Sequence, residues 1–241
     1  MSRSSDATAG LEGVDGAVAA FGRGDAVLIH DAADREGEVD LVYPAAAVDR
    51  SDVARMRNDA GGLVCVALAD DVCEAWGLPF ARSAIGHPAA EAHDLAYDDR
   101  SSFSITVNHR DVFTGITDDD RALTVSALGD AAAEVRRATS LAGEVARDAV
   151  AAGPEAFAER FRTPGHVHLL RAAPGLTDDR AGHTELGVAL ADHAGVAPAA
   201  VVCEMLDDED GGALSPTAAR AYADRNGLVY VEGADIIERF G

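Results

Sequence analysis

The chain contains no lysine, and its 20 basic residues are all arginine. Against them stand 42 acidic residues, which gives a net charge of -22 at pH 7. This charge repels nucleic acid and anionic lipid, so neither is expected as a partner. The acids are scattered rather than gathered in one block, which indicates a solvated acidic surface. A lysine-free, alanine-rich acidic surface resembles those of proteins from extreme halophiles, in which high salt screens the self-repulsion.

Cysteine is also scarce. The three cysteines are odd in number and form no CxxC pair, which argues against a disulfide framework and a thiolate zinc site. Cys65 and Cys203 lie in apolar runs and are predicted to be reduced core residues.

No apolar stretch reaches the length of a bilayer span. Met1 to Gly10 lacks the features of a secretory signal, so we expect residues 1–10 to be a disordered tail on a cytoplasmic protein.

Strand-like and helical segments alternate along the rest of the chain, and residues 79–100 read as irregular. Strands are expected at 26–30, 39–43, 63–68, 102–107, 167–171, 201–204 and 228–231. Helices are expected at 48–60, 70–76, 118–133, 136–152, 184–194 and from Pro216 to Gly227. This pattern predicts a single α/β (α+β) domain over residues 11–241, with a mixed central sheet and surrounding helices.

The segment from Asp34 to Asp40 places four carboxylates and Arg35 between two strand-like runs. Carboxylate oxygens of this kind bind hard divalent cations such as Mg²⁺, and an arginine beside them can bind a phosphate. The acidic composition also fits a solvated loop without chemistry.

A second cluster, Arg180 to Glu185, precedes a predicted helix. The free N–H groups of a helix N-terminus attract anions, Gly182 permits close approach, and His183 can bind a metal. An ordinary capped helix with a solvated arginine and histidine fits the same residues.

Three further motifs each have a functional and a structural interpretation. His166, in the turn after Pro164-Gly165, suits a general acid or base but also fits an exposed histidine. Glu204, at the end of an apolar strand, is either paired in the interior or faces solvent. The turn Thr114 to Thr117 suits a phosphate and equally suits a helix start.

In this order, the motifs resemble 3,4-dihydroxy-2-butanone 4-phosphate synthase of riboflavin biosynthesis. The resemblance covers nearly the whole chain after about Leu11. The segments that carry it are Asp34 to Pro44, Gly62 to Leu68, Phe103 to Val107, Thr114 to Thr124, Pro164-Gly165-His166-Val167, Arg180 to Glu185, Val202-Cys203-Glu204 and the segment after Ser215.

The resemblance implies a lyase that converts D-ribulose 5-phosphate to L-3,4-dihydroxy-2-butanone 4-phosphate and formate. It implies Mg²⁺, with Mn²⁺ as a substitute, no organic cofactor, and a homodimer with active sites at the subunit boundary. The residues that it assigns form three sets. The metal ligands are Glu36 and His183. The catalytic residues are Glu36, Glu38, Asp40, His166 and Glu204. The substrate-binding residues are Arg35, Glu36, Asp40, Thr114, Arg180, Ala181, Gly182, His183, Thr184 and Glu204.

The chain departs from the family pattern in two places. The family usually has asparagine where Gly37 stands and glycine where Val39 stands, and the stretch 132–162 matches poorly and suggests an extra surface helix. No fused cyclohydrolase domain is expected. Two other functions fit the same residues: a metal-dependent sugar-phosphate phosphatase or aldolase, and an inactive binding relative. Because Glu36, His166, His183 and Glu204 are all present, the inactive relative is disfavoured.

Overall fold

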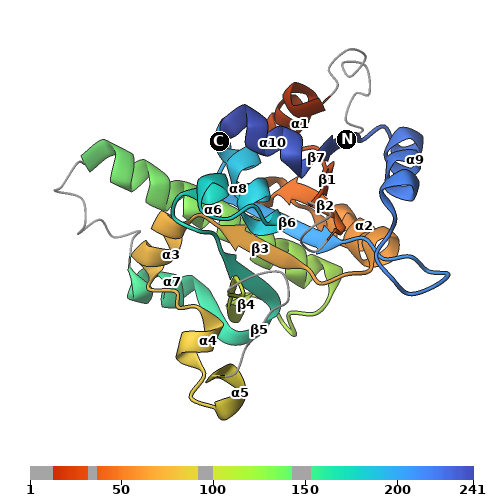
Figure 1. Cartoon of the computed structure of the whole chain (residues 1–241). Coiled ribbons are helices and arrows are strands. Elements are labelled where there is room, and N and C mark those ends of the chain that lie inside the picture. Colours follow the sequence, from red (N-terminus) through yellow and green to blue (C-terminus); the bar gives the residue numbers. More distant parts are fainter. Residues whose placement is uncertain (1–12, 32–36, 92–99, 143–152) are drawn as a thin grey trace.

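The computed structural model describes residues 13–31, 37–91, 100–142 and 153–241. Seven strands form one sheet in the order β4-β5-β3-β6-β2-β1-β7 (Figure 1). The strands are β1 (Val27–His30), β2 (Val39–Pro44), β3 (Cys65–Leu68), β4 (Phe103–His109), β5 (Phe161–Arg171), β6 (Ala199–Glu204) and β7 (Val229–Glu232). Because β1 pairs with β7 and β3 with β5 in parallel while the other pairs are antiparallel, the predicted mixed sheet is confirmed.

Helices cover both faces of this sheet. On one face lies α8 (His183–His193), which packs on β6, with α1 (Gly13–Gly22) and α10 (Gly233–Phe240) packed against it. The other face holds α2 (Arg50–Arg55), the π turn Met56–Ala60 and the long helix α6 (Asp118–Ala142). Helix α9 (Pro216–Asn226) packs on β7.

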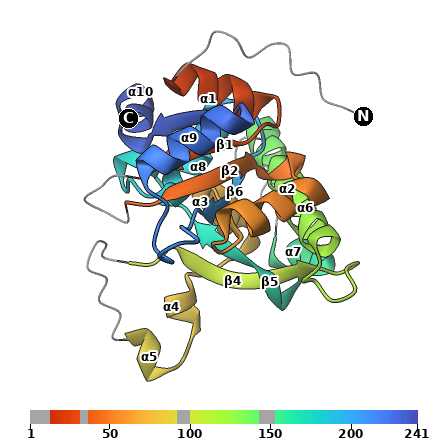
Figure 2. The same ribbon diagram turned by 90° about the vertical axis from the view of Figure 1, so that its right-hand side faces the viewer.

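Short helices complete the fold. Helix α3 (Asp70–Trp76) has the predicted bounds, and α7 (Pro154–Arg160) packs against it. Helices α4 (Ala81–Ala84) and α5 (Pro88–Glu91) occur within the stretch expected to be irregular and project from the sheet in Figures 1 and 2. The remaining turns are 3₁₀ segments at Ala45–Ala47 and Leu176–Asp178.

The helix ends follow the sequence signals. Asp49 accepts hydrogen bonds from the N–H groups of Ser51 and Asp52, and Ser215 accepts one from Ala218, so both helices begin at capping side chains. Gly195 and Gly227 follow α8 and α9 in left-handed conformations, as the sequence predicts.

Two sequence expectations were wrong in detail. Instead of a break between helices at 118–133 and 136–152, α6 is continuous to Ala142, because Glu134 and Val135 neither cap nor break a helix. Residues 143–152 of the second predicted helix lie outside the described residues. Strand β5 begins at Phe161 and continues through Pro164-Gly165, which we expected to form a turn before the strand. The antiparallel pairing of β5 with β4 is irregular beside this segment, where its register shifts between Val107 and Asn108.

The core lies between the sheet and its two helical layers. Its largest fully buried side chains include Tyr43, Phe21, Leu128, Leu169 and Leu186, which come from both faces. Cys65, Cys73 and Cys203 are free and buried, which confirms the prediction for Cys65 and Cys203. Within the described residues, no helix is both long and apolar enough to cross a bilayer. The predicted tail at 1–10 lies outside the described residues.

Candidate active site

Two carboxylates face each other where β2 begins and β6 ends. In the antiparallel pairing, Asp40 lies opposite Glu204. Side chains alternate along a strand, so both project from the face that carries Val42 and Val202. A β carbon on Gly187 of α8 would lie within 3.7 Å of both valines, so α8 covers this face. Asp40 is fully buried. Like charges opposite each other in a sheet are destabilising, so a cationic ligand would stabilise this arrangement.

Glu204 is neither fully buried nor simply turned to solvent. Its carboxylate Oε2 accepts a hydrogen bond from the N–H of Leu63 at 2.7 Å, and its backbone carbonyl accepts one from Gly62 at 3.0 Å. These bonds tie the end of β6 to the segment that enters β3. The carboxylate is therefore held in one place by backbone, while its other lone pairs stay available for chemistry.

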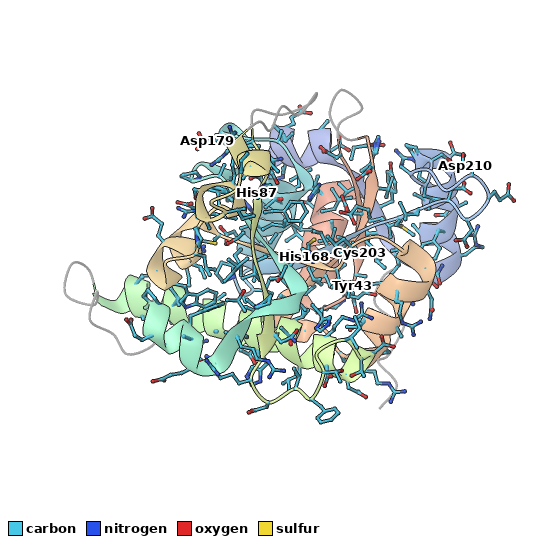
Figure 3. The ribbon with its side chains drawn as sticks, turned by 90° about the horizontal axis from the view of Figure 1, so that it is seen from below. Tyr43, His87, His168, Asp179, Cys203 and Asp210 are labelled. Atoms are coloured by element: carbon cyan, nitrogen blue, oxygen red, sulfur yellow. The ribbon has the colours of Figure 1, made fainter. Side chains whose placement is uncertain are left out.

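The neighbouring thiols are inert. Burial raises the pKa of Cys65 well above its usual value, with Glu204 adding to the effect, and raises the pKa of Cys203 to about 12. Both thiols therefore stay protonated and are poor nucleophiles and metal ligands. His168 lies opposite Cys65 on β5, and burial lowers the pKa of its imidazole while Glu204 opposes that shift. Figure 3 shows His168 and Cys203 on the central strands.

The acidic loop is described only in part. Arg35 and Glu36 lie outside the described residues. Gly37 has φ +65°, a left-handed conformation that glycine and asparagine both tolerate. Glu38 accepts a hydrogen bond at its carbonyl from the N–H of Asp31. Val39 is the first residue of β2 and is fully buried, so a β-branched residue suits a place where the family usually has glycine.

The start of α8 is a buried, polar helix N-terminus. Gly182 is the N-cap, Ala181 precedes it, and His183 begins the helix. Thr184 is fully buried, and among the described residues its hydroxyl Oγ1 has no hydrogen-bond partner. An unsatisfied buried hydroxyl beside free helix N–H groups suits an oxygen-rich ligand.

Arg180 contacts a carboxylate within the chain. Its guanidinium lies 2.7 Å from Oε2 of Glu185, whose other oxygen accepts a hydrogen bond from the N–H of Ala173. The two side chains are 8% and 0% exposed. Breaking a buried pair of this kind leaves an uncompensated charge, so Arg180 stabilises the start of α8.

His166 belongs to a second group of residues, at the junction of β4 and β5. Its exposed ring contacts Asn108, whose amide also binds the carbonyl of Thr114. The N–H groups of Thr114 and Gly115 both donate to Oδ2 of Asp120, at 3.2 and 2.8 Å. These bonds, that of Gly115 first, lower the pKa of the Asp120 carboxyl. The backbone donors of this predicted anion turn therefore already bind an internal carboxylate.

The structure thus sorts the predicted residues into two groups. Asp40, Glu204 and the start of α8 share one face of the sheet, whereas His166 and Thr114 meet at Asn108. Within the described residues, no cluster of three or more His, Cys, Asp or Glu side chains is arranged to bind a metal. Glu36, the other expected ligand beside His183, is not among them. The sequence did not indicate that Asn108 and Asp120 hold the Thr114 turn. Asn108 resembles an ordinary strand residue, and Asp120 resembles an ordinary acid in the first turn of a helix.

Comparisons with known proteins identify one enzyme family. A family model for 3,4-dihydroxy-2-butanone 4-phosphate synthase matches residues 15–239. The enzyme of that name from Archaeoglobus fulgidus is 46% identical over 230 residues, and the match covers 92% of this chain and 91% of the relative. The enzyme from Methanosarcina mazei is 46% identical over 239 residues, and the match covers 95% of this chain and 91% of the relative. A crystal structure of a synthase with two magnesium ions is 29% identical, has a TM-score of 0.75 and covers 95% of this chain and 96% of its own.

Proposed function

The chain belongs to the 3,4-dihydroxy-2-butanone 4-phosphate synthase family, and we propose that its active site combines the Asp40–Glu204 face with the start of α8. It is a lyase of riboflavin biosynthesis that converts D-ribulose 5-phosphate to L-3,4-dihydroxy-2-butanone 4-phosphate and formate. The observation that carries the site assignment is the opposition of Asp40 and Glu204 beneath the helix that begins at His183. The relatives do not favour the phosphatase, the aldolase or the inactive binding protein.

The reaction begins with removal of a proton beside a ketone, and later steps also move protons. Glu204 is fixed by the Leu63 N–H and can accept a proton without moving. Asp40, buried opposite it, provides a second carboxylate. Thr184 and the helix N–H groups beside it supply donors for the substrate's phosphate, and the Arg180–Glu185 pair stabilises that helix start.

The donor set fits a hard divalent cation. Glu36 and His183 would hold it, and Mg²⁺ prefers such carboxylate oxygens and shares its remaining positions with substrate and water. When bound, a divalent metal polarises the ketone carbonyl and stabilises the enediolate oxyanion. The magnesium in the related crystal structure supports this proposal, and Mn²⁺, which accepts the same ligands, should substitute.

Formate release should depend on the metal and on His183. Purified protein with ribulose 5-phosphate should release formate, lose activity in EDTA and regain it with Mg²⁺. His183→Ala removes the nitrogen ligand and should weaken Mg²⁺ binding, measured by calorimetry, and abolish activity. His193→Ala is the matched control, since His193 ends the same helix and stacks on Phe240 at 3.5 Å between ring centroids. Parent-like Mg²⁺ affinity in His183→Ala contradicts the metal assignment. Phosphate release without formate contradicts the function.

We propose that the chain forms a homodimer in which each active site contains residues from both subunits. The turn at Thr114 is flanked by two exposed apolar side chains, Phe113 at 94% and Ile116 at 54% exposure. Large apolar side chains this exposed next to a polar turn are typical of an interface. A two-fold dimer that covers them would bring the Thr114 turn of one chain to the carboxylate face of the other.

A cytoplasmic setting is proposed as well. All three cysteines are free and buried, which suits a reducing compartment.

The acidic surface should make the stability of the fold depend on salt. With a net charge of -22, unscreened repulsion opposes folding in dilute buffer. The screening length falls from about 30 Å at 0.01 M salt to about 3 Å at 1 M. The melting temperature should therefore rise as KCl increases into the molar range. Sucrose at matched osmolarity adds no screening and serves as the control. Equal melting temperatures in dilute buffer and molar KCl would contradict a halophilic surface.

A further inference from the structure

Asn108 contacts two backbone groups of opposite kind. It lies near the end of β4, and only 3% of it is exposed. Its Oδ1 accepts a hydrogen bond from the N–H of His166 at 2.8 Å, and its Nδ2 donates to the carbonyl of Thr114 at 3.4 Å. Because one neighbour is a donor and the other an acceptor, they fix which end of the amide is oxygen and which is nitrogen.

This orientation determines what the amide presents to the His166 ring. Nδ2 of Asn108 lies 3.1 Å from Nδ1 of His166, whereas Oδ1, already bonded to the backbone N–H, lies 3.3 Å away. A nitrogen that donates to Nδ1 requires a lone pair there. The neutral imidazole then carries its proton on Nε2. The shorter of the two contacts therefore favours the Nε2–H tautomer.

Close packing holds the amide in place. A β carbon on Gly115 would lie 2.0 Å from Nδ2 of Asn108, and one on Gly165 would lie 1.9 Å from the carbonyl carbon of Val107. Both glycines are thus needed for the Thr114 turn and the Pro164-Gly165 segment to approach β4 this closely. Asp120 holds the turn from its other side through the N–H groups described above.

We infer that Asn108 is a positioning residue, which holds His166 in the Nε2–H tautomer and fixes the Thr114 turn beside it. This inference rests on the proposed function and on the catalytic role that the family resemblance assigns to His166. In the Nε2–H form, His166 donates a hydrogen bond through Nε2 to a substrate oxygen. Its resting state then has no lone pair on that nitrogen to take a proton from carbon. Removal of the proton beside the ketone falls to the carboxylates of Asp40 and Glu204.

The substitution Asn108→Asp tests the inference, because it keeps the size and the acceptor for the His166 N–H. The second carboxylate oxygen cannot donate to Nδ1 and instead accepts from it. Long-range ¹⁵N–¹H spectra of the histidine rings should show Nε2–H in the parent and a proton on Nδ1 in Asn108→Asp, with His166→Gln identifying the signal. We expect kcat for formate release to fall by roughly 10²-fold, with KM changed less than about threefold.

Ser104→Ala is the matched control. Ser104 lies on the same strand, is 7% exposed and donates to the carbonyl of Pro79 at 2.5 Å, away from His166. It should leave both the tautomer and kcat unchanged. If the tautomer or kcat of Asn108→Asp matches the parent while His166→Gln is inactive, the positioning role is overturned and the proposed function stands. If His166→Gln turns over like the parent, the proposed role of His166 fails, and the positioning role fails with it.

Discussion

Glu204→Gln should lower the rate of formate release by on the order of 10³-fold while the protein still folds. The glutamine oxygen can keep the hydrogen bond from the Leu63 N–H, which holds the parent carboxylate at 2.7 Å. The substitution removes the negative charge and the lone pairs that accept protons. It also removes one of the two negative charges that lie opposite each other at this register position. Formate release with ribulose 5-phosphate measures the loss, and thermal melting confirms the fold.

Glu232→Gln provides the matched control for this change. Glu232 is the last residue of β7, as Glu204 is of β6, but its carboxylate binds His30 at 2.6 Å and Arg220 outside the proposed site. Its loss should alter thermal stability slightly and leave kcat near the parent value. If both variants lose activity to the same extent, or if Glu204→Gln stays active, the catalytic assignment of Glu204 is wrong.

Most of the sheet and several helices follow from local sequence. The apolar runs that end at His30, Tyr43 and Leu68 predict β1, β2 and β3 because buried strands need little more than β-branched and apolar residues. The order of the strands in the sheet, by contrast, does not follow from local sequence. β6 lies between β3 and β2, which are far from it in the chain, and no local pattern encodes that pairing.

The helices that sequence reasoning missed are those with weak local signals. Helix α1 is rich in glycine and alanine and is held by packing against β7 and α8 rather than by propensity. Helix α7 begins at Pro154 after Gly153, a start signal hidden within an alanine-rich stretch that read as a single surface helix. Tertiary packing therefore decided elements that composition alone left ambiguous.

The site divides in the same way. Asp40, Glu204, His183 and Thr184 were predicted from motifs, and strand register places the first two opposite each other. The internal partners were not predictable. Nothing in the local sequence indicates that Arg180 binds Glu185, because that contact depends on side-chain direction at the start of α8. Nor does it indicate that Asn108 links His166 to the Thr114 turn, because that link depends on the β4–β5 register shift.

Mixing two inactive variants should restore activity if each site is shared between subunits. One chain carries Glu204→Gln and the other Thr114→Val, and each homodimer should be nearly inactive. Arg180→Ala is avoided because it would leave Glu185 as a buried, unpaired charge and destabilise α8. In the mixed dimer, one site collects both substitutions and the other has neither. Activity should recover to about half the parent value per mixed dimer, by counting the sites of a two-fold dimer.

The contacts of Asn108 allow a second prediction for the subunit-mixing experiment. Because Asn108 contacts both His166 and Thr114, these residues enter a shared site from the same chain. His166→Ala should therefore complement Glu204→Gln and fail to complement Thr114→Val. Differently tagged subunits allow the heterodimers to be isolated and verified before assay. If the protein is active as a monomer, each site lies within one chain. The same conclusion follows if verified heterodimers of Glu204→Gln and Thr114→Val are as inactive as the homodimers. Complementation between His166→Ala and Thr114→Val would assign the two residues to different sides of the site.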